Sequence, residues 1–279
     1  MKQAMKIGEA LLWAASELKE SCDRPCYEAE LLLAYHLNCD RLHLHTRERQ
    51  TVEDLDGFQS FIKRRAANEP YEYITGEVSF YDLHLSVAPG VLIPRPETEL
   101  LIDRVSTIIE KEGIASLVEI GVGSGAISMV LARKFPHLRI VATDISKEAL
   151  SIAQQNIDRY QLGEQIRLIK SNLMDEVKDT VEMVISNPPY IANDFELERN
   201  VSEYEPHTAL FGGEVGDELL KRIITDTYEK GIRWLACEMG YDQKDALQEY
   251  VNEIGVEYLD FYQDLSGFDR GFLVKFSGS

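Results

Sequence analysis

An apolar strand pattern and a helical pattern meet in the segment Glu119-Ile120-Gly121-Val122-Gly123-Ser124-Gly125-Ala126. Its three glycines permit a tight turn and let a ligand approach the backbone without interference from Cβ atoms. A dinucleotide-binding fingerprint would place its third glycine one position later, where this chain has Ala126. The segment therefore predicts a strand, a glycine turn and a helix around a ligand, and its spacing leaves open which ligand that is.

The residues that follow repeat the order of strand, turn and helix. Candidate strands are Leu117–Ile120, Arg139–Thr143, Arg167–Lys170, Met183–Ser186 and Trp234–Glu238, with helices at about Ala126–Phe135, Lys147–Tyr160 and Asp217–Lys230. This alternation predicts an α/β domain in which helices cover both faces of a mostly parallel sheet. Two alternating runs in the tail, Val256 to Phe261 and Phe272 to Phe276, predict a terminal antiparallel pair of strands.

The first part of the chain has a different pattern. Apolar residues at helical spacing define three faces, from Ile7 to Leu18, from Leu31 to Leu37 and from Leu55 to Ile62. Short helices with modest loops predict a small bundle that ends near Pro70. Two alternating runs around Tyr81-Asp82 then predict a β-hairpin, and Pro96 is placed to open an amphipathic helix.

Composition describes an ordinary soluble globular protein of 279 residues, 44% hydrophobic and 28% charged. No stretch approaches the roughly 20 apolar residues of a membrane helix. Glu9, Glu17 and Lys19 interrupt the apolar stretch behind Met1, so we interpret it as a structural helix rather than a signal peptide. The four cysteines show no metal-ligand spacing, and we therefore expect reduced thiols, no metal site and a cytoplasmic protein.

The net charge of −19 is unevenly divided along the chain. Residues 1–75 carry 10 Lys and Arg against 13 Asp and Glu, whereas residues 76–279 carry 19 against 35. A protein that grips a nucleic-acid backbone normally presents Lys and Arg to the phosphates. The acidic balance therefore favours a protein partner over a nucleic acid.

Two further strand ends carry polar residues that suit a nucleoside. Asp144 ends its strand about 20 residues after the glycine turn, where a carboxylate can accept hydrogen bonds from both ribose hydroxyls. The same aspartate could instead cap the helix that begins near Ser146. At the end of the next strand, Asn172 and Leu173 could bracket an adenine ring.

The tetrapeptide Asn187-Pro188-Pro189-Tyr190 directly follows the apolar strand Met183–Ser186. Two prolines have fixed φ and no N–H, so the chain must leave the strand there as a rigid polar ledge. Hydrogen-bond acceptors on that ledge can take the N–H groups of a flat amide, and an aromatic ring can pack on its face. Asn-Pro and Pro-Pro are also common turn dipeptides, so the tetrapeptide alone could be an ordinary turn. Its position in the chain, after the glycine turn and Asp144, favours a role in binding.

Together these residues resemble a class I methyltransferase that uses S-adenosylmethionine. More narrowly, the chain is similar to the protein-(glutamine-N5) methyltransferases that modify release factors, the PrmC/HemK family. The similarity extends to Glu69-Pro70, Tyr73–Gly76, Val91–Glu99, Glu205–Leu210 and Asp264–Arg270, in the order of the family. It covers most of the chain and is weakest over the first 65 or so residues.

The resemblance implies a Rossmann-like seven-stranded sheet with a small N-terminal helical bundle. It implies a helical domain over residues 1–75 that recognises the release factor, a β-hairpin linker over 76–92 and a catalytic domain over 93–279. The partner is then a peptide chain release factor, with no direct nucleic-acid contact and no membrane contact, and the protein is expected to be a monomer.

The resemblance also implies roles for individual residues. S-adenosyl-L-methionine, which becomes S-adenosyl-L-homocysteine, is expected to bind Glu119, Gly121, Val122, Gly123, Ser124, Gly125, Asp144, Asn172, Leu173 and Asn187. Asn187, Pro188, Pro189 and Tyr190 are expected to hold the substrate glutamine, with Asn187, Pro188 and Tyr190 as the catalytic residues. The family frequently has an aromatic where this chain has Leu173, so apolar contact would replace adenine stacking there.

Four other functions remain open at this point. A ribosomal protein glutamine, or the exocyclic N6 of adenine in nucleic acid, presents the same kind of –NH2 group to the ledge. An NAD(P)-dependent oxidoreductase could use the glycine turn and Asp144, but it leaves the Asn-Pro-Pro-Tyr segment unexplained. A binding module without activity is disfavoured by the intact set of pocket residues.

Overall fold

The structure is a computed structural model, and it describes residues 4–277. The ends of the first and last expected domains, residues 1–3 and 278–279, lie outside the described residues. By their internal contacts the residues form two compact units, residues 1–76 with 198–204 and residues 77–197 with 205–279. Each unit has its own hydrophobic core.

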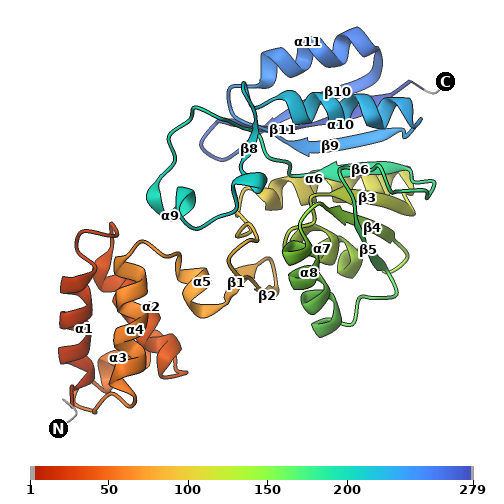
Figure 1. Ribbon diagram of the computed structural model, residues 1–279. Coiled ribbons are helices and arrows are strands. Elements are labelled where there is room, and N and C mark those ends of the chain that lie inside the picture. The colour runs from red at the N-terminus through yellow and green to blue at the C-terminus, as the bar shows by residue number, and fades with distance from the viewer. Residues whose placement is uncertain (1–3, 278–279) are drawn as a thin grey trace. The chain divides into compact units, whose positions relative to one another are not determined.

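The first unit is helical (Figure 1). Its helices are α1 (Ile7–Glu17), α2 (Pro25–His36), α3 (Arg41–Thr46), α4 (Leu55–Ala66), α5 (Tyr71–Thr75) and the short α9 (Arg199–Ser202). Helices α1, α2 and α4 bury the apolar faces that the sequence predicted, and Phe58 and Ile62 are fully buried among them. The Tyr204 hydroxyl donates to the carbonyl of Ala67 (2.7 Å), which ties the segment around α9 to the end of α4.

The second unit is built on a seven-stranded sheet with the order β10-β11-β9-β6-β3-β4-β5. Its strands are β3 (Ser116–Ile120), β4 (Arg139–Asp144), β5 (Ile166–Lys170), β6 (Met183–Ser186), β9 (Trp234–Glu238), β10 (Val256–Gln263) and β11 (Asp269–Phe276). Strands β5, β4, β3, β6 and β9 are parallel, and β11 and β10 complete the sheet in antiparallel fashion. The predicted mixed sheet is therefore confirmed.

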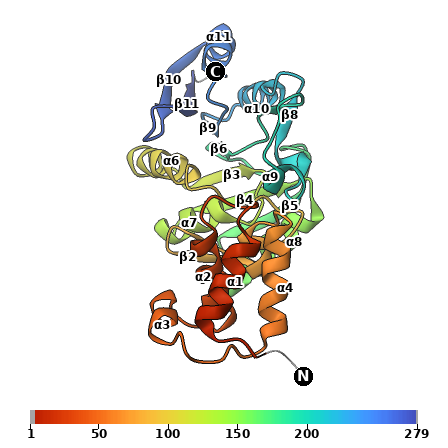
Figure 2. The same cartoon turned by 90° about the vertical axis from the view of Figure 1, so that its left-hand side faces the viewer.

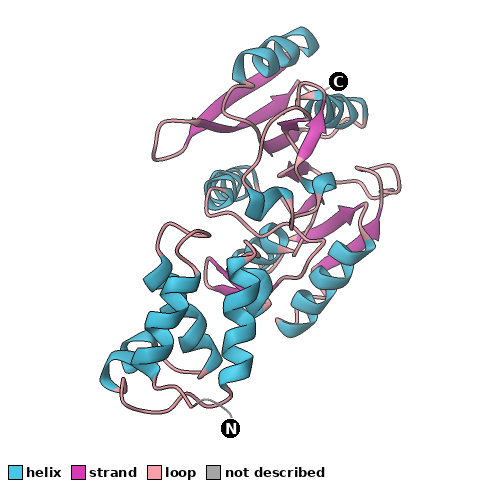
Figure 3. Ribbon diagram, turned by 60° about the vertical axis from the view of Figure 1, so that its left-hand side comes forward, coloured by secondary structure: helices cyan, strands magenta, loops and turns pink. Residues whose placement is uncertain are grey.

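Helices cover both faces of this sheet (Figures 2 and 3). One face packs against α6 (Thr98–Glu112), α7 (Ala126–Lys134) and α8 (Lys147–Arg159), and the other packs against α10 (Glu218–Glu229) and α11 (Lys244–Ile254). Alternate residues of one strand serve the two cores, as with Leu117 on one face and Val118 on the other. Period-2 alternation between two covered faces explains why the strands are apolar along their whole length.

Smaller elements connect these layers. The predicted hairpin is present as β1 (Glu77–Phe80) and β2 (Leu83–Ser86), paired antiparallel. Helix α6 begins at Thr98, two residues later than Pro96 alone suggested. A short parallel pair, β7 (Ile191–Ala192) and β8 (Phe211–Gly213), and the 3-10 turn His207–Ala209 follow the end of β6. Among the described helices, none has the length and apolar content needed to cross a bilayer.

Candidate active site

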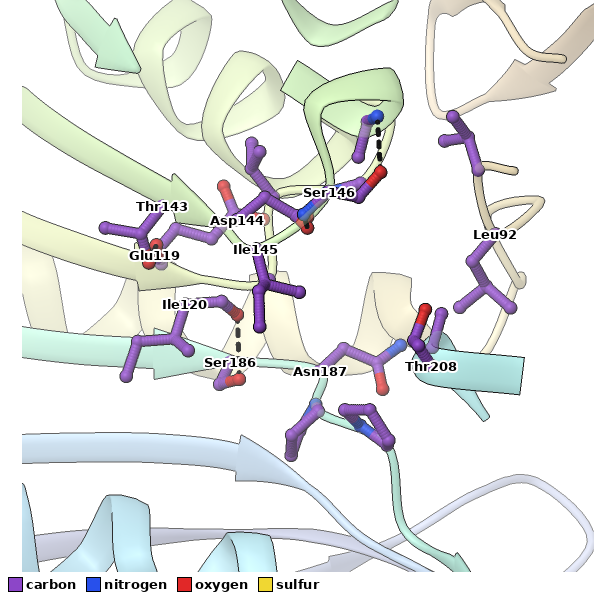
Figure 4. Close-up of a pocket in the computed structure, with 18 of the residues that line it drawn as sticks. Leu92, Glu119, Ile120, Thr143, Asp144, Ile145, Ser146, Ser186, Asn187 and Thr208 are labelled. Atoms are coloured by element: carbon purple, nitrogen blue, oxygen red, sulfur yellow. Dashed lines mark hydrogen bonds between the residues drawn. The ribbon is translucent and has the colours of Figure 1, made fainter. Parts of the chain in front are cut away.

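A cavity of about 390 Å³ opens at the carboxyl ends of β3, β4, β5 and β6. The chain runs from β3 outward to β4 and β5 and then returns to β6 on the other side of β3, so the strand order reverses at β3. In open α/β sheets ligands bind at this reversal, because the loops after the strands diverge there and leave a crevice. Figure 4 shows the cavity with Asp144 and Ile145 on one side and Asn187 and Leu92 on others.

The glycine turn after β3 forms one wall of the cavity. Gly121 and Gly123 have φ of 76° and 54°, a region that residues with a Cβ rarely adopt. The N–H groups of Gly121 and Val122 both donate to the carbonyl of Thr143 (2.9 Å each), which ties the turn to the end of β4. The turn therefore holds a fixed shape and presents its backbone to the cavity.

Asp144 is oriented by two backbone donors. The N–H of Gly123 donates to its Oδ2 (3.0 Å), and the N–H of Ser146 donates to its Oδ1 (2.9 Å). Burial raises the pKa of Asp144, and these hydrogen bonds oppose that rise. The cap of α8 is a different residue, because the Ser146 hydroxyl accepts from the N–H of Ala149 (3.1 Å). A carboxylate offers about four lone-pair sites, so Asp144 keeps capacity for ligand hydroxyls.

Glu119 lies at the end of β3 and is only 1% exposed. Its carboxylate accepts hydrogen bonds from the Ser128 N–H (3.0 Å) and the Ser128 hydroxyl, both on α7. Burial raises the pKa of Glu119 to about 8, because desolvation of the charged form outweighs the two donors. The group lines the cavity, so a ligand cation there would favour its charged form.

We expect Glu119→Gln to stabilise the ligand-free protein at pH 9 but not at pH 5. In the unfolded chain the carboxyl loses its proton near its ordinary pKa, whereas the folded protein keeps it to about pH 8. Stability is thus lost as pH rises between those values, and a neutral side chain removes this cost, on the order of 5 kcal/mol. Thermal melting at the two pH values measures it, with the exposed Glu164→Gln as a control. Equal shifts at both pH values would contradict the expectation.

Asn172 and Leu173 follow β5 and line the cavity. Leu173 has φ of 51° and is 7% exposed, since it packs into the core beneath α10. Asn172 is exposed and donates through Nδ2 to the Asp175 carboxylate (3.3 Å). Leu173 and Ile145 therefore provide apolar surface on this side of the cavity, next to the Asp144 carboxylate.

The Asn187-Pro188-Pro189 ledge forms the opposite wall. The Ser186 hydroxyl donates to the carbonyl of Ile120 (2.8 Å), which fixes the ends of β6 and β3 together (Figure 4). Asn187, Pro188 and Pro189 all line the cavity. The Asn187 side chain donates through Nδ2 to the Thr98 hydroxyl oxygen (3.1 Å) at the start of α6.

Tyr190 occupies a different place from the other residues of the ledge. It is half-buried, does not line the cavity and packs against the core that contains Leu220 and Phe272. Burial raises the pKa of Tyr190 to about 12, and the nearby Glu238 carboxylate adds to the rise. Its carbonyl accepts from Nε2 of Gln243 (2.8 Å), so both backbone and ring hold the ledge from behind.

A glycine in β8 lets the chain lie directly against the ledge. A Cβ atom added to Gly212 would fall 2.5 Å from the Pro189 carbonyl oxygen and 2.5 Å from the Gly216 carbonyl oxygen. Two carbonyls cannot yield as a flexible side chain can. The position of Pro189 therefore depends on a neighbour without a side chain.

We expect Gly212→Ala to lower kcat by roughly 10-fold, because displacement of the ledge by even 1 Å can cost up to two orders of magnitude. The affinity for the expected ligand, S-adenosylhomocysteine, should change little, since the glycine turn and Asp144 are untouched. Gly163→Ala is the matched control, because nothing lies within 4 Å of its added Cβ. Steady-state kinetics and calorimetry measure both quantities, and a Gly212→Ala enzyme with unchanged kcat would contradict the expectation.

The structure gathers most of the expected site residues at one cavity. Those that line it are Glu119, Gly121, Val122, Gly123, Ser124, Asp144, Asn172, Leu173, Asn187, Pro188 and Pro189. Gly125 does not line it and instead caps α7 with φ of 90°. Sequence reasoning assigned no site role to Leu92, Thr98, Ile145, Ser146, Thr208 or Phe211, which also line it. Leu92, Thr98 and Thr208 belong to the segments Val91–Glu99 and Glu205–Leu210, which the sequence singled out without giving them a site role, whereas Ile145, Ser146 and Phe211 lie outside those segments.

Arg95 also lines the cavity, and its principal partner belongs to the fold. Its guanidinium pairs with the buried carboxylate of Glu205, whose second oxygen accepts the N–H of Ile93 (3.1 Å). This joins the two segments that flank the cavity mouth. The principal contact of Arg95 is therefore with an internal carboxylate.

Comparison with known proteins places this site in a family. The profile of the PrmC N-terminal domain matches residues 9–76, and that of the methyltransferase small domain matches residues 96–203. A release factor glutamine methyltransferase of Koribacter versatilis is 39% identical over 244 residues, covering 84% of this chain and 86% of the relative. This chain belongs to the release factor glutamine methyltransferase family. The family member of Clostridium acetobutylicum is 32% identical over 285 residues, covering 98% of this chain and 100% of the relative.

Solved structures agree with this fold. The catalytic domain of human METTL16 in complex with an RNA hairpin superposes with a TM-score of 0.58 at 19% identity, covering 82% of this chain and 84% of that chain. The N-terminal domain of human METTL16 in complex with SAH gives 0.53 at 17%, covering 96% and 94%. At such identities the likeness shows the methyltransferase fold alone, and the substrate has to be argued from the site.

The residues of this methyltransferase fit S-adenosylmethionine. Asp144 can present its carboxylate to the ribose hydroxyls, and Leu173 and Ile145 can present apolar surface to the adenine ring. Gly121 has no side chain, so the methionine part of the cofactor can approach the backbone there. Gly121 and Gly123 have positive φ, so a residue with a Cβ atom at either position would be strained. Among residues 4–277, no group of three or more His, Cys, Asp or Glu side chains is arranged to hold a metal ion.

Proposed function

We propose that this protein transfers a methyl group from S-adenosylmethionine to the side-chain amide nitrogen, N5, of a glutamine in peptide chain release factors. The observation that carries the proposal is that Asn187, Pro188 and Pro189 line the same cavity as the glycine turn and Asp144. When bound, S-adenosylmethionine supplies a methyl group on a positively charged sulfur. The chain's own residues must then present an amide nitrogen to that group.

An amide nitrogen is a poor nucleophile because its lone pair is delocalised into the carbonyl. The carboxyl groups of Glu119 and Asp144 in the cavity already accept hydrogen bonds, from the Ser128 hydroxyl and from backbone N–H groups, so we assign neither as a base. Instead, Asn187 Oδ1 and the Pro188 carbonyl accept the two N–H groups of the substrate amide and orient its nitrogen. The nitrogen becomes acidic only after methylation and then loses its proton to water.

The remaining residues support this arrangement from behind. The fixed φ of Pro188 and Pro189 and the hydrogen bond from Ser186 to Ile120 hold the ledge still. We propose that Tyr190 contributes to catalysis by packing beside the ledge and keeping water out. Gly125, as the N-terminal cap of α7, sets the direction in which the glycine turn enters that helix.

We further propose that residues 1–75 recognise the release factor, residues 76–92 act as a linker and residues 93–279 carry catalysis. The match of residues 9–76 to the PrmC N-terminal domain supports the first of these ranges. We also propose that the protein acts as a monomer and in the cytoplasm. The excess of acidic residues after residue 75 supports a protein substrate over nucleic acid.

The test is to incubate the protein with methyl-labelled S-adenosylmethionine and, in separate reactions, with purified release factor, ribosomal protein and DNA. Label on a glutamine of the release factor is the expected result, and mass spectrometry of the digested product locates it. Label that enters only a ribosomal protein glutamine or adenine would overturn the proposed substrate while leaving the chemistry of the ledge intact.

A further inference from the structure

The two ends of the Asn187 side-chain amide have nearly the same shape, so hydrogen bonds decide which end faces the substrate. Nδ2 donates to the Thr98 hydroxyl oxygen (3.1 Å). A substrate –NH2 group can use only an acceptor, which is the Oδ1 end. The partner of Nδ2 on the far side therefore matters for turnover.

Thr98 is the first residue of α6 and is 4% exposed. Its hydroxyl hydrogen-bonds to the carboxylate of Glu238, the last residue of β9, which is also 4% exposed. A carboxylate has no proton to donate, so the single proton of the hydroxyl must go to Glu238. The hydroxyl then has only lone pairs left for Asn187, and only the Nδ2 end can complement them.

We propose that Thr98 and Glu238 are positioning residues that fix the Asn187 amide with Nδ2 toward α6 and Oδ1 toward the substrate. The three residues come from the start of α6, the end of β6 and the end of β9, and no sequence motif joins them. This inference rests on the proposed function, because only a substrate that donates N–H groups requires an acceptor at this point.

The arrangement has a built-in dependence on the charge of Glu238. Burial raises its pKa to about 7, and one of its oxygens, Oε1, has no hydrogen-bond partner among the described residues. Once protonated, Glu238 can donate to Thr98, whose hydroxyl can then donate to Asn187 Oδ1. The Asn187 amide would then flip and present Nδ2 to the substrate –NH2. Both groups are donors, so no hydrogen bond could form between them.

Other charged and titratable groups act on Glu238 from each neighbouring element. Glu97 before α6 raises its pKa and Arg270 of β11 lowers it. Tyr190, Tyr262 and Cys237 are coupled to it as well, and each has a pKa raised by burial and by the Glu238 charge. These three stay neutral across the range in which Glu238 changes charge. The expected profile therefore has a single rising limb near pH 7 from this group.

The first test compares Thr98→Val with Thr98→Ser in turnover of the labelled methyl group onto release factor. Loss of one orienting hydrogen bond should lower kcat about 3- to 10-fold in Thr98→Val, and Thr98→Ser should recover most of it. KM and the affinity for S-adenosylhomocysteine should stay near the wild-type values. Thr227→Val is the matched control, because among the described residues that buried hydroxyl bonds only to the carbonyl of Ile223 in its own helix.

The second test is the pH profile of kcat between pH 5.5 and 9. Wild-type kcat should rise through about pH 7, and this limb should be absent in Glu238→Gln, which cannot change charge. If that variant does not fold, as melting would show, the side-chain ¹⁵NH2 signal of Asn187 replaces it. This signal is identified by its absence from the spectrum of Asn187→Ala. Its chemical shift should change between pH 6 and 8 in the wild type but not in Thr98→Val.

The positioning role is overturned if Thr98→Val behaves like Thr227→Val, if serine does not rescue, or if neither the rising limb nor the Asn187 signal depends on these residues. A failure of the proposed substrate looks different. In that case the wild-type enzyme leaves release factor unlabelled but labels another –NH2 acceptor, and the same variants assayed on that acceptor still test the positioning role.

Discussion

Replacement of Asn187 by alanine should lower kcat by about 100-fold or more, with the affinity for S-adenosylhomocysteine changed by less than about 3-fold. Alignment of reacting groups can supply roughly 7–11 kcal/mol of the barrier reduction, whereas one positioned hydrogen-bonding group typically supplies about 3 kcal/mol. Asn187 contributes to both, because its Oδ1 both polarises and orients the substrate amide. An interaction used mainly in the transition state lowers kcat rather than ligand affinity.

Single-turnover kinetics and calorimetric titration measure these two quantities. Asn252→Ala is a suitable control, because that asparagine is exposed on α11 and does not line the cavity. Equal losses in kcat and in affinity for S-adenosylhomocysteine would contradict the assignment of Asn187 to the substrate amide, since they would show that Asn187 chiefly binds the cofactor. A loss shared by the control would instead indicate general damage to the fold.

Replacement of Asp144 by alanine should weaken binding of S-adenosylhomocysteine by roughly 100-fold, the opposite division between affinity and kcat. Hydrogen bonds to a charged group contribute about 1.5–3 kcal/mol each, and two ribose hydroxyls would share this carboxylate. Asp144→Asn should also bind poorly, because its –NH2 end would face the N–H of Gly123 or of Ser146, both of which now donate to the carboxylate.

Calorimetry of the purified variants gives the affinities, and saturating S-adenosylmethionine should restore much of kcat in Asp144→Ala. Asp245→Ala, on the exposed side of α11, serves as the control. Unchanged affinity in Asp144→Ala would mean that this carboxylate serves only to fix the glycine turn. That outcome would also remove the ribose contact from the proposed cofactor site.

The fold could be predicted from sequence wherever the local residue pattern and the tertiary structure favour the same secondary structure. The strands Met183–Ser186 and Trp234–Glu238 were predicted with the bounds that the structure has, because both are short apolar runs between breakers. Helix α11 was not predicted, since its apolar residues are few and only Leu247 and Val251 are buried. The pairing of β7 with β8 was missed because such short strands carry too little pattern.

The site residues also divide into those that could be predicted from sequence and those that could not. Gly121, Gly123 and Asp144 could be singled out because a backbone turn and the strand end that follows it impose fixed spacings. Thr98, Glu205 and Glu238 could not, because their partners are distant in sequence. Asn187 and Thr98 are 89 residues apart. The pairing of β6 with β3 and with β9 places the end of β6, next to Asn187, at the same edge of the sheet as Glu238.

The sequence by itself determined the alternation of strands and helices, the glycine turn and the rigid proline ledge, because each depends on residues adjacent in the chain. The tertiary structure alone decided that Tyr190 packs behind the ledge, that Arg95 pairs with Glu205 and that the Asn187 amide bonds to Thr98. The physical reason is that hydrogen bonds and burial act over a few ångströms in space, whatever the separation along the chain.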